Sequence, residues 1–246
     1  MKALVIGELC IDKFIYGEVS RFSPEAPVPV LNPVDIIEND GMAGNVVRNL
    51  LSLDPNLEID QWHQQEEITK TRLVEKKSNH MFIRIDEGEK EITPLDLTTE
   101  MILSLKGYDF VIVSDYAKGF LSNSDLVNIA SNSSLSILDS KRKITKEIAE
   151  SFTFIKLNES EAQRNTEFLD FGNILITLGS KGVEFCGQVY SSPDPQETID
   201  VSGAGDTFTA SFILNYSNTG DVEDSIIWAN KMAAIVVSKR GVATPN

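Results

Sequence analysis

Short apolar runs that each end in a small or polar residue recur along the chain. Their length and their branched side chains are typical of strands that are buried on both faces of a sheet. The segments between the later runs are long enough for helices. The clearest runs cover residues 3–8, 110–115, 135–139, 154–158 and 174–179.

Strands that alternate with helices predict an α/β fold with a mostly parallel sheet and helices on both faces. We expect helices over residues 121–131, 144–152 and 159–169, the first capped by Ser122 or Ser124. In such sheets ligands bind beyond the carboxyl ends of the strands. The polar residues at those ends, each of which could equally be an ordinary turn residue, are Asp115, Asp139, Asn158 and Thr177.

A second pattern, closer to strict alternation, covers residues 14–38 and 71–92. It predicts strands at 28–31, 71–74 and 81–86, each with one face in water. These strands are too few to form a domain alone. We therefore expect a small antiparallel β lid on a single domain that spans the whole chain. The apolar face of the lid needs a cover, which favours a homodimer through the lid strands.

Composition narrows the class of protein. The chain has 246 residues, 41% of them hydrophobic, and a formal net charge of −15. That charge argues against nucleic acid or a membrane surface as the partner, although it does not exclude one bound nucleotide. There is no apolar stretch of transmembrane length and no signal-peptide pattern, and only Cys10 and Cys186 are cysteines. We expect a cytoplasmic protein without a disulfide framework, and no zinc site.

The segment most informative about chemistry covers residues 198–208. A short strand, Thr198–Val201, leads into Gly203, Ala204 and Gly205, and a helix is expected to begin near Asp206. Backbone amides at a helix N-terminus bind anions, and a carboxylate beside them suits phosphoryl transfer. A glycine-rich turn with Asp206 as a helix cap explains these residues equally well. Neither a P-loop nor a complete G-x-G-x-x-G motif is present.

Residues 200–208 resemble the C-terminal signature of the ribokinase-like sugar kinases, also called the phosphofructokinase B family. Further motifs follow in the order of that family. Residues 41–47 resemble its sugar-binding turn, 158–161 its N-x-x-E motif and 176–182 its nucleotide turn, and Asn230 matches a position in the adenine pocket. The resemblance covers nearly the whole chain and implies a ribokinase-like fold.

Within that family, residues 21–30 are very similar to a hallmark of the heptose 7-phosphate kinases, the kinase domains of bifunctional ADP-heptose synthases. Residues 84–86, 115–119 and 139–141 also fit that group. The resemblance implies phosphoryl transfer from ATP to the anomeric hydroxyl of D-glycero-D-manno-heptose 7-phosphate. The alternatives are a kinase for another sugar or a nucleoside, and a truncated, non-catalytic ligand-binding homologue.

The resemblance also implies individual roles. Asp206 would be the general base, and Gly203, Ala204 and Gly205 the anion hole. Asn158 and Glu161 would hold Mg²⁺, partly through water, and Asp200 is more weakly implied in a monovalent-cation site for K⁺. The residues implied to contact ATP are Asn158, Thr177, Gly179, Gly182 and Asn230.

The acceptor sugar phosphate requires hydroxyl-binding groups and a cation. Asp12, Gly41 and Asn45 are implied to hold the sugar, because carboxylate and amide groups suit bidentate hydroxyl recognition. The sugar's own phosphate needs a positive charge nearby. The sequence leaves four candidates unranked, each of which could equally be a surface cation: Arg21, Arg84, Lys118 and Lys141.

Two features depart from the family pattern. Family members are usually longer than this chain. The missing length is expected at residues 51–70, where other family members have a further strand–helix–strand passage. Its loss would narrow the sheet and expose an edge. Met42 stands where the family has the second of two glycines, so we expect an altered sugar pocket. No nucleotidyltransferase pattern is present, so any such activity is expected elsewhere.

Overall fold

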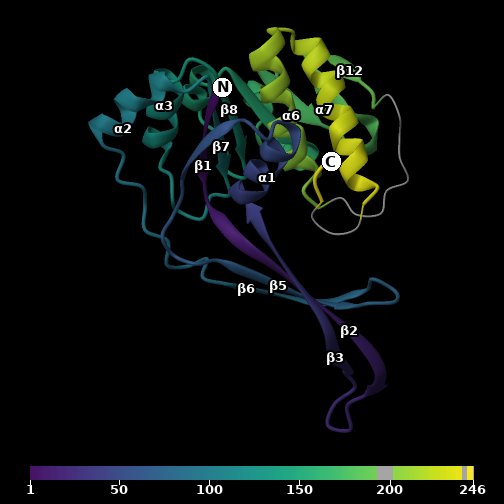
Figure 1. The fold of residues 1–246 in the computed structure, drawn as a ribbon. Coiled ribbons are helices and arrows are strands. Elements are labelled where there is room, and N and C mark those ends of the chain that lie inside the picture. The colour runs from purple at the N-terminus through teal and green to yellow at the C-terminus, as the bar shows by residue number, and fades with distance from the viewer. Residues whose placement is uncertain (193–201, 240–242, 246) are drawn as a thin grey trace.

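The computed structural model describes residues 1–192, 202–239 and 243–245. Within them the main sheet has eight strands in the order β12-β11-β10-β9-β8-β7-β1-β4 (Figure 1). In this order, the six neighbouring strands β10, β9, β8, β7, β1 and β4 pair in parallel, and β11 and β12 are added at the β10 edge in antiparallel pairing. The strand bounds are β1 Lys2–Gly7, β4 Glu58–Trp62, β7 Phe110–Asp115, β8 Ser136–Ser140, β9 Phe154–Asn158, β10 Ile174–Thr177, β11 Val183–Phe185 and β12 Gln188–Tyr190.

Helices cover both faces of this sheet, as predicted. One layer consists of α1 (Ala43–Leu53), α6 (Ala204–Thr219) and α7 (Val222–Val237). The other consists of α2 (Thr99–Ser104), α3 (Asn123–Asn132), α4 (Lys146–Ser151) and α5 (Glu159–Arg164). Side chains of β1 alternate between the two cores, with Leu4 and Ile6 in one and Ala3 and Val5 in the other. Burial on both faces explains the continuous apolar runs.

Side-chain caps begin several of these helices. Ser122 accepts a hydrogen bond from the Asp125 amide at 3.1 Å, and the Asp125 carboxylate accepts one from the Ser122 amide at 2.8 Å. This reciprocal capping box identifies Ser122, rather than Ser124, as the cap of α3. Asn158 and Glu161 form the same arrangement at α5.

The second sheet, which we call the lid, contains β2 (Leu9–Phe22), β3 (Pro29–Met42), β5 (Thr69–Glu75) and β6 (Met81–Glu87). Its order is β3-β2-β5-β6, and it projects away from the main sheet (Figure 1). The pairs β2–β3 and β5–β6 are antiparallel, as predicted, but β2 pairs with β5 in parallel. The strands β2 and β3 are longer than the alternation indicated, since β2 follows β1 after one residue and β3 runs directly into α1.

The short passage between α1 and the lid contains a strand that the sequence pattern did not reveal. This strand, β4, pairs with β1 and is one edge of the main sheet. The chain then returns to the lid at β5 without a further helix. The strand predicted at Thr198–Val201 lies outside the described residues. Among the described helices, none is long and apolar enough to cross a membrane.

Candidate active site

Asp206 lies in the first turn of α6, directly after the turn formed by Gly203–Gly205. Gly203 precedes the helix at φ 81°, a left-handed conformation that suits glycine, and its carbonyl accepts the Thr207 amide. The Asp206 carboxylate accepts two hydrogen bonds, one from Asn45 Nδ2 at 2.8 Å and one from the Tyr116 hydroxyl at 3.3 Å. Asn45 belongs to α1, so the fold brings two motifs together that lie far apart in sequence.

The surroundings of Asp206 raise its pKa to about 6. Burial among protein groups is the largest cause, and the negative charge of Asp139 is the next. The hydrogen bond from Asn45 and the charges of Lys156 and Lys141 act in the opposite direction. A carboxylate with this pKa is ionised near neutral pH and still basic enough to accept a proton.

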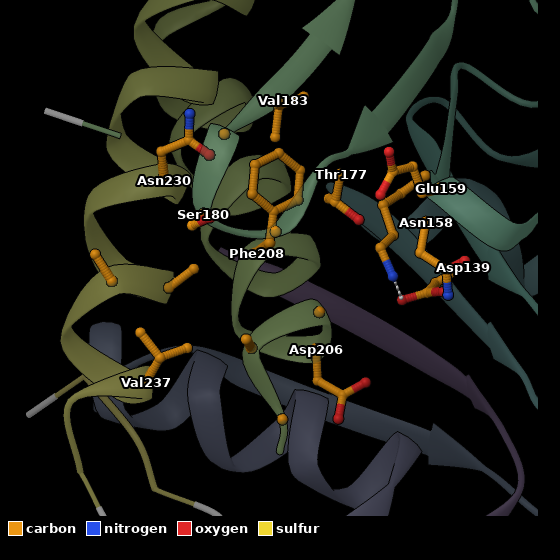
Figure 2. A pocket seen from close by; sticks show the side chains of 18 of the residues that line it. Asp139, Asn158, Glu159, Thr177, Ser180, Val183, Asp206, Phe208, Asn230 and Val237 are labelled. Carbon is orange, nitrogen blue, oxygen red and sulfur yellow. Dashed lines mark hydrogen bonds and ion pairs between the residues drawn. The ribbon is translucent and has the colours of Figure 1, made fainter. Parts of the chain in front are cut away.

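A buried ion pair lies beneath the glycine turn. Lys156 of β9 donates to Asp139 Oδ2 of β8 at 2.9 Å (Figure 2). Burial acts to raise the pKa of Asp139, but the charges of Lys156 and Lys141 lower it below its usual value. Asp139 Oδ1 is buried without a hydrogen-bond partner. A Cβ at residue 205 would lie 3.0 Å from Lys156 Nζ, so Gly205 permits the close approach of this ammonium group.

A cavity of about 560 Å³ opens beside these groups. Its size and its mixture of apolar and polar walls are typical of a small-molecule site. One wall is apolar and includes Val183 and Phe208, with Asn230 and Val237 of α7 nearby (Figure 2). The residues predicted from sequence that line it are Lys141, Asn158, Thr177, Gly179, Gly182, Gly203, Ala204, Gly205, Asp206 and Asn230.

The turn between β10 and β11 requires its glycines. Gly179 has φ 59° and Gly182 has φ 97°. A Cβ on Gly182 would lie 2.1 Å from the Tyr190 carbonyl oxygen. The Tyr190 carbonyl oxygen also accepts a hydrogen bond from Asn230 Nδ2 at 2.8 Å, which fixes its position. The glycines of the predicted nucleotide turn therefore have a steric reason, and the turn is connected to α7.

The N-x-x-E motif mainly organises the start of α5. Glu161 Oε2 accepts the Asn158 amide at 2.7 Å, and its Oε1 accepts Lys141 Nζ, also at 2.7 Å. Both carboxylate oxygens are thus engaged, and Glu161 is not among the residues that line the cavity. No group of three or more His, Cys, Asp or Glu side chains among the described residues could hold a metal ion. The motif therefore fits a magnesium ion that is bound through its water ligands, rather than one that is bound directly by Glu161.

Two predicted sugar-binding residues, Asp12 and Gly41, lie together in the lid, and the third, Asn45, donates to Asp206. A Cβ on Gly41 would lie 2.3 Å from Asp12 Oδ2 and 2.7 Å from Cys10 Sγ, so these lid residues are in close contact. Asp12 also pairs with Arg72 of β5. Met42 is buried with Cys10 and packs near Tyr116. It has φ 57°, a strained conformation for any residue except glycine.

The four predicted cations do not gather at one place. Arg21 is exposed at the far end of β2, and Arg84 pairs with Asp86 on the exposed strand β6. Lys118 pairs with Glu89, whereas Lys141 reaches the cavity. Asp200, the predicted monovalent-cation ligand, lies outside the described residues.

Sequence reasoning did not assign site roles to three groups that contact this region: Tyr116, Asp139 and Lys156. Tyr116 directly follows β7 and Asp139 lies near the end of β8, both within motifs that carried the resemblance. Lys156 interrupts the apolar run of β9. A lone lysine in a strand buried on both faces was a usable signal, because such a charge needs a buried partner.

Comparison with known proteins identifies the family of the chain. Residues 43–246 match the family described as pfkB family carbohydrate kinase. Two relatives named bifunctional protein HldE are from a Nitratiruptor species and from Aliarcobacter butzleri. The first is 30% identical over 295 aligned positions, covering 99% of this chain and 63% of the relative. The second is 31% identical over 294 positions, covering 98% and 62%. This chain therefore spans less than two thirds of the length of these relatives.

Solved structures share the fold at low sequence identity. Ribokinase from Thermotoga maritima has a TM-score of 0.73 at 16% identity, covering 98% of this chain and 94% of that chain. Phosphofructokinase-2 from Escherichia coli, in complex with potassium, has a TM-score of 0.72 at 12% identity, covering 98% and 93%. The fold is ribokinase-like, and the family match extends from α1 to the C-terminal end of the chain, including residues 158–161, 176–182 and 200–208. The chain belongs to the pfkB family of carbohydrate kinases.

Proposed function

We propose that this kinase phosphorylates the anomeric hydroxyl of D-glycero-D-manno-heptose 7-phosphate, with ATP as the donor. The resemblance of residues 21–30 and 115–119 to heptose 7-phosphate kinases supports the choice of sugar. The relatives named HldE, which match almost the whole chain, agree with it. The position of Asp206 between the cavity and the Asp12–Gly41 region carries the proposal for the reaction.

Asp206 accepts the proton of the attacking hydroxyl in this proposal. Asn45 holds one carboxylate oxygen, while the longer hydrogen bond from Tyr116 leaves the other more open to exchange with the acceptor hydroxyl. A pKa of about 6 leaves Asp206 mostly ionised at neutral pH. The fixed hydrogen bond from Asn45 orients the carboxylate before the acceptor arrives.

The transferring phosphoryl group lies over the turn at Gly203–Gly205 in this proposal. Backbone amides at the start of α6 can donate to its oxygens, and the helix dipole favours its negative charge. Lys141 lines the same cavity, and Lys156 lies directly beneath Gly205. Both ammonium groups can balance the charge that develops on the equatorial oxygens.

ATP occupies the cavity in this proposal, with its base against Val183, Phe208 and Val237 and its phosphates toward Gly203–Gly205. Asn158 fits an outer contact to Mg²⁺, and Glu161 fixes Asn158 and Lys141 in position. When bound, Mg²⁺ neutralises phosphate charge and shapes the triphosphate. A K⁺ site at Asp200 stays a prediction.

We also propose that the lid mediates a homodimer. Both edge strands of the lid, β3 and β6, expose large apolar side chains, which a second copy would cover. These side chains are Val34, Ile36, Ile37, Met81, Phe82, Ile83 and Ile85.

The test of the reaction is ATP consumption measured against a panel of free and phosphorylated sugars and nucleosides. We expect the highest kcat/KM with D-glycero-D-manno-heptose 7-phosphate and formation of the 1,7-bisphosphate. Asp206→Asn should lower kcat by at least ~100-fold, since it removes the base, while ATP still binds in calorimetry.

The outcomes separate the parts of the proposal. Turnover of another sugar but not of this heptose phosphate would contradict the substrate. An Asp206→Asn variant with full activity would contradict the general base. Absence of turnover with every acceptor, despite ATP binding, would favour a non-catalytic homologue.

A further inference from the structure

A group of charged side chains lies on the acceptor side of Asp206, outside the residues that line the nucleotide cavity. Lys70 of β5 and Lys118, which follows β7, both pair with Glu89, at 3.4 Å and 2.5 Å. The side chains of Lys70 and Glu89 are only 12% and 19% exposed, and that of Lys118 is 32% exposed. Two ammonium groups share the single carboxylate of Glu89, so these three side chains together carry a net positive charge.

One aromatic ring connects this group to the candidate base. Lys70 Nζ lies 5.6 Å from the centre of the Tyr116 ring, and the Tyr116 hydroxyl donates to Asp206. Lys141 Nζ is 5.7 Å from the same ring but lines the nucleotide cavity, where Glu161 pairs with it. The lysines near Tyr116 therefore divide into one on the nucleotide side and two on the acceptor side.

The backbone that carries Lys118 is held in an unusual conformation. The amides of Tyr116 and Lys118 both donate to the carboxylate of Glu8, each at 2.9 Å, and Glu8 is fully buried. Ala117 between them has φ 56°, a left-handed conformation that costs free energy for alanine. A buried carboxylate thus fixes a strained turn that presents Tyr116 to Asp206 and Lys118 to Glu89. A rigid turn of this kind lowers the entropic cost of ordering its side chains when a ligand binds.

Lys70 also belongs to the surroundings of the predicted sugar-binding residues. Cys10 lies against Gly41, and burial raises the pKa of its thiol to about 12. Lys70 lies opposite Asp12 where β2 pairs with β5, and the charges of Asp12, Lys70 and Asp206 act on the pKa of that thiol. Arg72 is already paired with Asp12. Lys70 therefore lies beside the predicted sugar-binding residue Asp12, and Glu89 connects Lys70 to Lys118.

We propose that Lys70 and Lys118 bind a phosphate group of the acceptor, one that is attached at a different position from the reacting hydroxyl. Glu89 holds both ammonium groups in place before the phosphate binds. A phosphate offers three strong acceptor oxygens to two ammonium groups. This inference rests on the proposed function, since it names the residues that recognise a phosphorylated acceptor. It sets aside Arg21 and Arg84, which point to no shared site in this chain. The competing explanation is a structural role, in which the two ion pairs only stabilise the contact between β5 and the turn after β7.

The test compares the free and the phosphorylated form of one sugar in Lys70→Met and Lys118→Met. We expect each variant to lose roughly 10- to 100-fold in kcat/KM for the phosphorylated form, mainly through KM, because a charge-assisted contact is lost. The free sugar and the KM for ATP should be unaffected. The matched control is Lys13→Met, which removes a lysine paired with Glu38 on the same lid. It should leave kcat/KM unchanged for both the phosphorylated and the free sugar. Lys118→Arg should recover part of the loss.

Equal losses of kcat/KM for the free and the phosphorylated sugar would establish the purely structural role and overturn the binding site. A wild-type enzyme that does not prefer phosphorylated acceptors would overturn it as well. If heptose 7-phosphate fails but another sugar phosphate shows a preference that depends on Lys70, the proposed substrate is wrong and the site stands. Calorimetry with the same sugar pairs gives this comparison independently of turnover, and equal binding of both forms would again overturn the site.

Discussion

At the scale of single residues, the chemistry depends on how neighbouring charges set the basicity of Asp206. Burial and Asp139 raise its pKa, whereas Asn45 and Lys156 lower it. These opposing effects come from α1, β8 and β9, which meet only in the folded chain. The same carboxylate in an exposed turn would titrate near roughly 3.9 and would be a weaker base.

Two substitutions should move the acid limb of the pH–rate profile in opposite directions. Asp139→Asn removes a negative charge and frees Lys156, and both effects lower the pKa of Asp206, so activity should persist to lower pH. Asn45→Ala removes a donor to the ionised carboxylate, so the limb should move to higher pH. We expect shifts on the order of one pH unit, measured as kcat/KM from about pH 5 to 8.

The comparison between variants is the informative quantity, because a phosphorylated acceptor also titrates near about pH 6. The same acceptor is used throughout, and its own titration then cancels. Shifts of the same sign in both variants, or no shift in either, would contradict the assignment of this limb to Asp206.

At the scale of elements, the turn between β10 and β11 connects a local glycine requirement to nucleotide binding. Gly182 and Gly187 both have positive φ, but only Gly182 lies against another part of the backbone. Gly182→Ala should therefore lower stability by more than about 2 kcal/mol and raise the KM for ATP, because the turn must move away from Tyr190.

Gly187→Ala is the matched control, since nothing lies within 4 Å of its new Cβ. It should cost only the conformational strain, about 1 kcal/mol, and leave the KM for ATP unchanged. Thermal denaturation and ATP kinetics provide the measurements. Equal effects of the two substitutions would show that the Tyr190 contact has no influence on the nucleotide turn.

The elements also show which parts of the fold local patterns can predict. Short apolar runs identified β1, β7, β8, β9 and β10, because burial on both faces leaves a strong signal. The edge strand β4 has charged and polar residues, and its assignment depends on pairing with β1. The lengths of β2 and β3 likewise follow from their mutual pairing, which no local pattern contains.

At the scale of the whole molecule, the lid is the least covered part of the described chain. Most of β6 faces solvent, and large apolar side chains lie on both edges of the lid. Light scattering in solution should give the mass of a dimer. The double variant Ile36→Lys, Ile83→Lys should give a monomer, because two charges would have to be buried in the interface.

Leu103→Lys is the control, since Leu103 is equally apolar and exposed but belongs to α2, away from the lid. It should leave the dimer intact. A wild-type monomer at micromolar concentration, or a dimer that survives both lid substitutions, would contradict the lid interface.

The sequence by itself determined the alternation of strands and helices and the order of the motifs, and the family resemblance of residues 200–208 indicated Asp206 as the candidate base. These features are local, because a strand buried on both faces and a glycine turn before a helix each leave their own pattern. The tertiary structure decided which charged residues share a site. Lys70 and Lys118 meet at Glu89, whereas Arg21 and Arg84 lie at exposed positions of the lid. Such a meeting depends on how distant strands pair, and a lysine in sequence carries no mark of its eventual neighbours.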